Sequence, residues 1–117
     1  MGSFKKLIAG VLAACALTVQ AAEPSKEQVI AASALLAADW LQTRYIARHP
    51  DQFFEHNPLL GRHPSIGRVN THFLGAFLLG YTLTQWGYCN RSCYSVFIAL
   101  EGANVARNFS IGIRFEF

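Results

Sequence analysis

Three apolar stretches follow one another along this chain, and the arginines around them are unevenly distributed. The stretches cover roughly residues 29–46, 73–86 and 96–105. Six arginines surround the first link or follow the third stretch: Arg44, Arg48, Arg62, Arg68, Arg107 and Arg114. The second link holds only Arg91. If all three stretches cross a membrane, the six arginines lie on one side, as the positive-inside rule expects. The pattern predicts transmembrane helices, with residues 47–68 and the C-terminus facing the cytoplasm.

The composition agrees with a small membrane protein of one domain. Apolar residues make up 52% of the 117-residue chain and charged residues 15%, with a mean hydropathy of +0.24. Both values depart from an ordinary soluble domain. From Glu23 onward there are eight basic and seven acidic side chains, a net charge of +1. This balance, without a basic patch, argues against nucleic acid as a partner.

Residues 1–22 have the pattern of an export leader. Lys5 and Lys6 precede an apolar run over residues 7–19, and small residues follow it. This order predicts a signal peptide cleaved near Ala22, or an uncleaved signal anchor. Residues 12–15 also resemble a bacterial lipobox, which would make Cys15 a lipidated N-terminus. In each case residue 23 starts outside the cytoplasm, and residues 23–117 form a single helical membrane domain.

The residues at the segment ends predict an all-α fold, a small bundle of three helices. Ser25 with Gln28 three positions later resembles a capping box, and Pro50 would stop the same helix. The expected helices cover about residues 25–49, 65 or 68 to 86, and 93–108. None has 20 uninterrupted apolar residues, the length that a bilayer normally requires. The interrupted apolar sequence of the helices favours an alternative, an exported soluble domain.

The C-terminal residues 110–117 alternate apolar and polar side chains with a period of two. Such alternation predicts a short strand-like tail. Gly112, Phe115 and the final Phe117 also resemble the terminal signal of outer-membrane proteins. The tail therefore supports an outer-membrane-associated domain as a further form of the exported alternative.

Polar side chains on the first and third helices are expected to face each other. Glu101, Asn104 and Asn108 share one helix face at positions i, i+3 and i+7. Charged and amide groups are costly at membrane depth, so they should pair inside the bundle. The predicted polar cluster consists of Asp39, Gln42, Arg44, Glu101, Asn104 and Asn108. Two interpretations stay open: a proton, ion or head-group site, or interhelical hydrogen bonds that fix the packing.

The first link supplies a second candidate site, at Glu55, Asn57 and His63. Its spacing matches no zinc or metalloprotease pattern, so we expect neither a metal nor a cofactor. The serines lie in no nucleophile elbow, and no catalytic residue is predicted. Cys89 and Cys93 lie in the second link, where a disulfide and two free thiols are both compatible with their spacing.

Several of these positions together carry a resemblance to a known group. The residues are Asp39, Thr43, Glu55, Asn57, Pro58 and Asn70. Over about residues 36–74 the chain resembles small uncharacterised bacterial and phage helical membrane proteins of the DUF5658-like group. The resemblance implies a helical membrane protein and no assigned activity.

Together these observations predict a small accessory integral membrane protein of the bacterial inner membrane, with an interaction or structural role. Its expected partners are membrane lipid and another membrane protein or a second copy of the chain. An alternative is a membrane-embedded enzyme, or an ion or head-group site, that uses Asp39, Glu55, His63 and Glu101. That alternative predicts that these groups converge in a pocket and that burial raises the pKa of Glu101. The exported domain, in the periplasm or at the outer membrane, is the third hypothesis.

Overall fold

The computed structural model describes residue 6 and residues 23–117 of the chain. The predicted leader over residues 1–22, apart from residue 6, lies outside the described residues. The predicted lipidation at Cys15 lies outside them as well.

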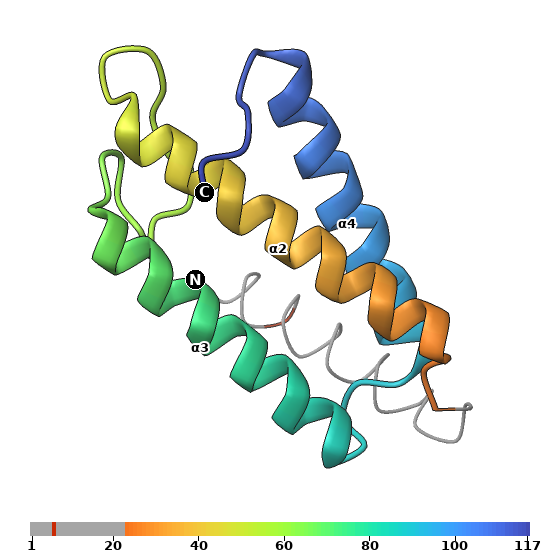
Figure 1. The fold of residues 1–117 in the computed structure, drawn as a ribbon. Coiled ribbons are helices and arrows are strands. Elements are labelled where there is room, and N and C mark those ends of the chain that lie inside the picture. The colour runs from red at the N-terminus through yellow and green to blue at the C-terminus, as the bar shows by residue number, and fades with distance from the viewer. Residues whose placement is uncertain (1–5, 7–22) are drawn as a thin grey trace.

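Three α-helices form the described part of the chain, in the order α2 (Lys26–Arg48), α3 (Ile66–Gln85) and α4 (Arg91–Ser110) (Figure 1). The predicted all-helical bundle is confirmed. The capping box at the start of α2 is also present, since Ser25 and Gln28 exchange side-chain hydrogen bonds with each other's backbone N–H. The side chain of Asn90 caps α4 by accepting from the N–H of Cys93, so α4 begins two residues earlier than expected.

The helix α2 lies between the other two and makes the main contacts with both of them (Figure 1). A buried apolar cluster fills the α2–α3 side. Its members are Leu60, Val69 and Phe73, with Leu36, Trp40 and Ala47 packed against them. The indole ring of Trp40 stacks on the ring of Phe73, with centroids 6.0 Å apart. The loop residue Leu60 completes this core, so the link between α2 and α3 is held against both helices.

The transmembrane character that the sequence predicts is not supported. Among the described residues, no helix combines the length and the hydropathy needed to cross a membrane. Their lengths of 20 to 23 residues would suffice, because each residue adds about 1.5 Å to a helix. The helices are continuous, but polar side chains interrupt their apolar sequence, for example Asp39 and Gln42 in α2 and Glu101 in α4.

The predicted strand-like tail is wrong, because residues 111–117 form no strand. The tail returns along α2 instead. The backbone N–H of Glu116 donates to the carbonyl of Leu41, at 3.0 Å, and Ile113 is buried. The described residues include no strand with which an alternating segment could pair, so its polar groups bond to the helix.

A disulfide joins Cys89 in the α3–α4 turn to Cys93 in the first turn of α4. It closes the turn at the end of the bundle opposite the 49–65 loop (Figure 1). Disulfides of this kind form in oxidising compartments. The exported position of this turn stays a prediction.

Candidate functional site

Two carboxyl groups from facing helices meet where α2 crosses α4. Asp39 projects from α2 and lines the same cavity as Glu101 of α4. The Oδ1 atom of Asp39 accepts from Nδ2 of Asn104 at 3.4 Å. The hydroxyl of Thr43 donates to the backbone carbonyl of Asp39 at 2.8 Å and lies 3.3 Å from Oδ1. The Oε1 atom of Glu101 is buried and has no hydrogen-bond partner.

Two amides from the predicted cluster form a separate contact one helical turn away. Gln42 is fully buried, and its Nε2 donates to the carbonyl of Val105 at 3.1 Å. Its Oε1 accepts from Nδ2 of the buried Asn108, also at 3.1 Å. Because both amides are buried and joined, they fix how α4 sits on α2.

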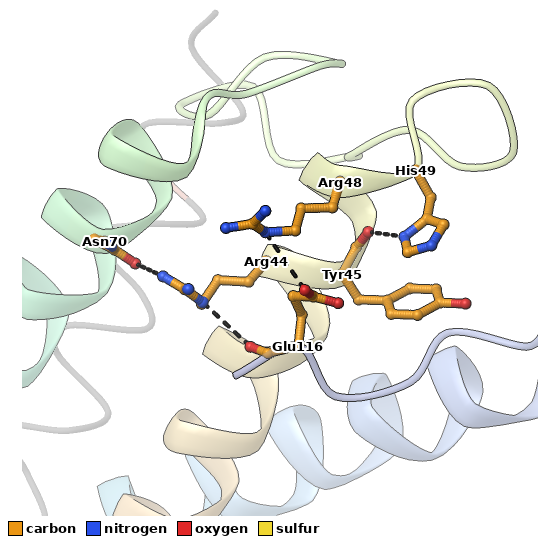
Figure 2. A network of polar contacts seen from close by, with 6 residues as sticks. All are labelled: Arg44, Tyr45, Arg48, His49, Asn70 and Glu116. Carbon is orange, nitrogen blue, oxygen red and sulfur yellow. Dashed lines mark hydrogen bonds and ion pairs between the residues drawn. The ribbon is translucent and has the colours of Figure 1, made fainter.

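Arg44, expected as the counter-charge of the cluster, points to another side of α2. Figure 2 shows its guanidinium between Asn70 of α3 and the C-terminal tail. Its Nη1 donates to Oδ1 of Asn70 at 2.7 Å, and its Nε donates to the carbonyl of Glu116 at 3.2 Å. The Glu116 carboxylate pairs with Arg48, with Nε and Oε1 3.4 Å apart. Arg44 therefore ties α2 to α3 and to the tail, and leaves the Asp39–Glu101 contact without its charge.

The loop between α2 and α3 brings further polar groups to Asp39 and Glu101. Glu55 turns its Oε1 back to accept from the backbone N–H groups of His56 and Asn57, at 3.0 and 3.1 Å. Between this loop and the helices lies a cavity of about 410 Å³. Its polar and ionisable lining comprises Asp39, Thr43, Glu55, His56, Asn57, His72, Glu101 and Asn104. A second cavity of about 660 Å³ shares Asp39, Glu55, His56 and Asn104 with it.

The cavity unites residues from both predicted sites, with exceptions. His63 is exposed and lines neither cavity. His72 and Thr43 line the cavity although neither belongs to a site predicted from the sequence. Thr43 follows Asp39 by four positions, a spacing that places both on one helix face. No sequence pattern indicated that His72 of α3 would point to the same place.

The environment of Glu101 favours its neutral form. Burial, with a smaller contribution from the neighbouring carboxyl group of Asp39, raises the pKa of Glu101 from 4.5 to about 9. Asp39, Glu55 and Glu101 line one cavity, whereas His63, the fourth group of the alternative with an ion or head-group site, does not. Within residue 6 and residues 23–117, no group of three or more His, Cys, Asp or Glu side chains has metal-binding geometry.

Comparison of the chain with protein-family models, with curated proteins and with solved structures finds no match. The resemblance to the DUF5658-like group thus stays a prediction.

Proposed function

We propose that this protein is a small membrane-associated accessory protein that contacts lipid through the outer surface of α3. The observation that carries the proposal is the exposure of large apolar side chains on α3 and on the turn that follows it. These residues, here called the α3 apolar surface, are Leu74, Leu78, Leu79, Tyr81, Trp86 and Tyr88.

The charge distribution supports lipid as the occupant of this surface. No Asp, Glu, Lys or Arg occurs between Val69 and Asn90. Tyr and Trp are the side chains that gather at membrane interfaces, and three of them end the α3 apolar surface. Six arginines lie in the other half of the molecule, near the 49–65 loop and the tail, where they can attract anionic lipid head groups. An exposed apolar patch rimmed by polar residues is typical of such a contact.

Quenching of Trp86 by brominated lipid tests the proposal at the surface itself. Trp86 is 70% exposed. In a Trp40→Phe background of the full chain, we expect vesicles of brominated phosphatidylethanolamine and phosphatidylglycerol to quench its fluorescence. Leu78→Asp should weaken the vesicle affinity measured in this way by about tenfold or more, because burying a leucine side chain contributes about 1.5–3 kcal/mol.

Leu59→Asp is the matched control, since Leu59 is 71% exposed and Leu78 is 68% exposed. Leu59 belongs to the α2–α3 loop at the opposite end of α3, so its replacement should leave quenching unchanged. Absence of quenching in the background chain would reject lipid contact. An equal loss of quenching in Leu78→Asp and Leu59→Asp would place the lipid contact elsewhere. If Trp86 became shielded from solvent as the protein concentration rose, with no lipid present, a second copy of the chain would be the occupant of the surface.

A second candidate function is binding of an ammonium group in the cavity beside Asp39. The convergence of Asp39, Glu55 and Glu101 on this cavity favours it, since carboxylate and amide oxygens accept from ammonium. Ethanolamine, the head group of phosphatidylethanolamine, is the probe. We expect calorimetry to detect its binding and Asp39→Asn to reduce the affinity by about tenfold or more. Exposed Glu27 supplies the control variant, Glu27→Gln. Ethanolamine binding that is equal in both variants would rule out the cavity.

A further inference from the structure

We propose that the two cavities beside Asp39 together hold a phosphoethanolamine group, a zwitterion in which two carbons join a phosphate to an ammonium. The ammonium site of the second candidate function is the part on which this proposal rests. The two cavities adjoin, because Asp39, Glu55, His56 and Asn104 line both of them. One ligand can therefore extend from the smaller cavity into the larger one.

Opposite charges line these cavities at two different places. The carboxyl groups of Asp39, Glu55 and Glu101 line the smaller cavity. The larger cavity adds the guanidinium of Arg107, an exposed residue of α4. Among the described residues, Arg107 forms no ion pair with either Asp39 or Glu55. An arginine and two carboxylates that share a cavity without pairing leave each sign of charge available to a ligand that carries both.

The spacing of these charges suits a short zwitterion. Nδ2 of Asn104 donates to Oδ1 of Asp39 at 3.4 Å, so the Asp39 carboxylate lies beside this position of α4. Arg107 follows Asn104 by three positions and shares its helix face, with the two Cβ atoms about 5–6 Å apart. The positive and negative groups of the site are thus about one helical turn apart along α4. A linker of two carbons between phosphate and ammonium spans a distance of this order.

Each end of the ligand meets side chains of the matching chemistry. The guanidinium of Arg107 presents a planar fork of N–H donors, which matches two oxygens of a phosphate. The carboxylate oxygens of Asp39 and Glu55 accept from an ammonium, which has donors only. Glu55 is held in place for this role, because its Oε1 already accepts from the backbone N–H groups of His56 and Asn57.

The larger cavity also has an apolar side, which a head group alone would leave unused. Its apolar lining consists of Ile46, Phe53, Phe54, Ile111 and Ile113. Ile46 and Ile113 are buried, whereas Ile111 is 49% exposed at the end of α4. An apolar lining with a few placed polar groups is typical of ligand sites. This side fits the first carbons of an acyl chain, so phosphatidylethanolamine matches the cavities better than the free head group does.

Calorimetry of the full chain with ethanolamine, O-phosphoethanolamine and inorganic phosphate tests the charge arrangement. We expect O-phosphoethanolamine to bind about tenfold or more tightly than ethanolamine, because it adds charge-assisted hydrogen bonds to Arg107. Arg107→Gln should remove this gain and leave ethanolamine binding at least as tight as before, since a nearby cation repels an ammonium. Arg91→Gln is the matched control, because Arg91 is exposed at the opposite end of α4 and lines neither cavity.

The contrary outcomes separate this proposal from the ammonium site on which it rests. If ethanolamine binds and O-phosphoethanolamine binds no more tightly, the phosphoethanolamine site is overturned and the ammonium site stands. If inorganic phosphate binds as tightly as O-phosphoethanolamine, the cavities take an anion and both sites are overturned, as they are if none of the three ligands binds. An equal loss of affinity in Arg107→Gln and Arg91→Gln would also overturn the proposal, because it would reflect only the net charge of the chain.

Dihexanoyl phosphatidylethanolamine, supplied below the concentration at which it forms micelles, distinguishes the lipid from the free head group. We expect it to bind about tenfold or more tightly than O-phosphoethanolamine, because it also buries apolar carbons. Ile111→Ser should remove most of this advantage. Ile30→Ser is the control, since Ile30 is 58% exposed and lines neither cavity. Equal binding of the two ligands would overturn the lipid as the source. None of these results depends on lipid contact at the α3 apolar surface.

Discussion

Replacing Phe73 with alanine should lower the free energy of unfolding by about 3–5 kcal/mol, which is the usual cost of removing a buried aromatic side chain. Phe73 is 3% exposed and stacks on Trp40 in the apolar cluster between α2 and α3. The surrounding groups come from two helices and from Leu60 of the loop, so the space left behind cannot close easily. Urea unfolding followed by circular dichroism measures the change.

Leu74→Ala is the matched control for this result, because Leu74 follows Phe73 on the same helix but is exposed. Its replacement should change the free energy of unfolding by no more than about 0.5 kcal/mol. If Phe73→Ala costs no more than Leu74→Ala, then α3 does not pack on α2 as described. The loss expected for Phe73→Ala is a large part of the total stability of a domain of this size, about 5–15 kcal/mol.

The buried amide pair should give the second large effect. Gln42→Leu removes the partner of Asn108 and leaves its amide group buried and unpaired, at a cost of about 1–3 kcal/mol. Asn108→Leu should cost a similar amount, because it strands Oε1 of Gln42. The double variant should lose less than the two single losses combined, since neither amide is then left without its partner. A double-mutant cycle of unfolding free energies measures this coupling.

Ser95→Ala serves as the control for the amide pair, because it also removes a hydrogen bond between α2 and α4. That bond, from Nε2 of Gln28 to the hydroxyl of Ser95 at 3.0 Å, is exposed to solvent. Its loss should cost no more than about 0.5 kcal/mol. Strict additivity of Gln42→Leu and Asn108→Leu would show that the amides do not contact each other.

Local signals in the sequence predicted most of the secondary structure. The capping box at Ser25 and Gln28 needs only residues three positions apart, and Pro50 acts on its own helix. The start of α4 was missed because Asn90 caps it from within the expected turn. The tail was misjudged because period-two alternation describes a segment without its neighbours, and the neighbour here is a helix.

The candidate site was predicted in part, for a reason that lies in the packing. Helical spacing places Asp39 and Gln42 near one face of α2, and Glu101, Asn104 and Asn108 on one face of α4, so their meeting could be expected. Spacing does not determine how one helix is rotated toward another. Arg44 consequently lies against Asn70 and the tail, away from the predicted cluster. His72 of α3 lines the cavity although no signal in the sequence predicted it.

Because α2 lies between α3 and α4, a destabilising substitution on one side of α2 need not disturb the packing on its other side. The cluster around Phe73 lies on its α3 side and the pair of Gln42 and Asn108 on its α4 side, and α3 and α4 make few direct contacts. The two interfaces share a helix without sharing side chains, so they are energetically independent to a first approximation. A substitution in the Phe73 cluster and one in the Gln42–Asn108 pair should therefore lower the free energy of unfolding by nearly additive amounts.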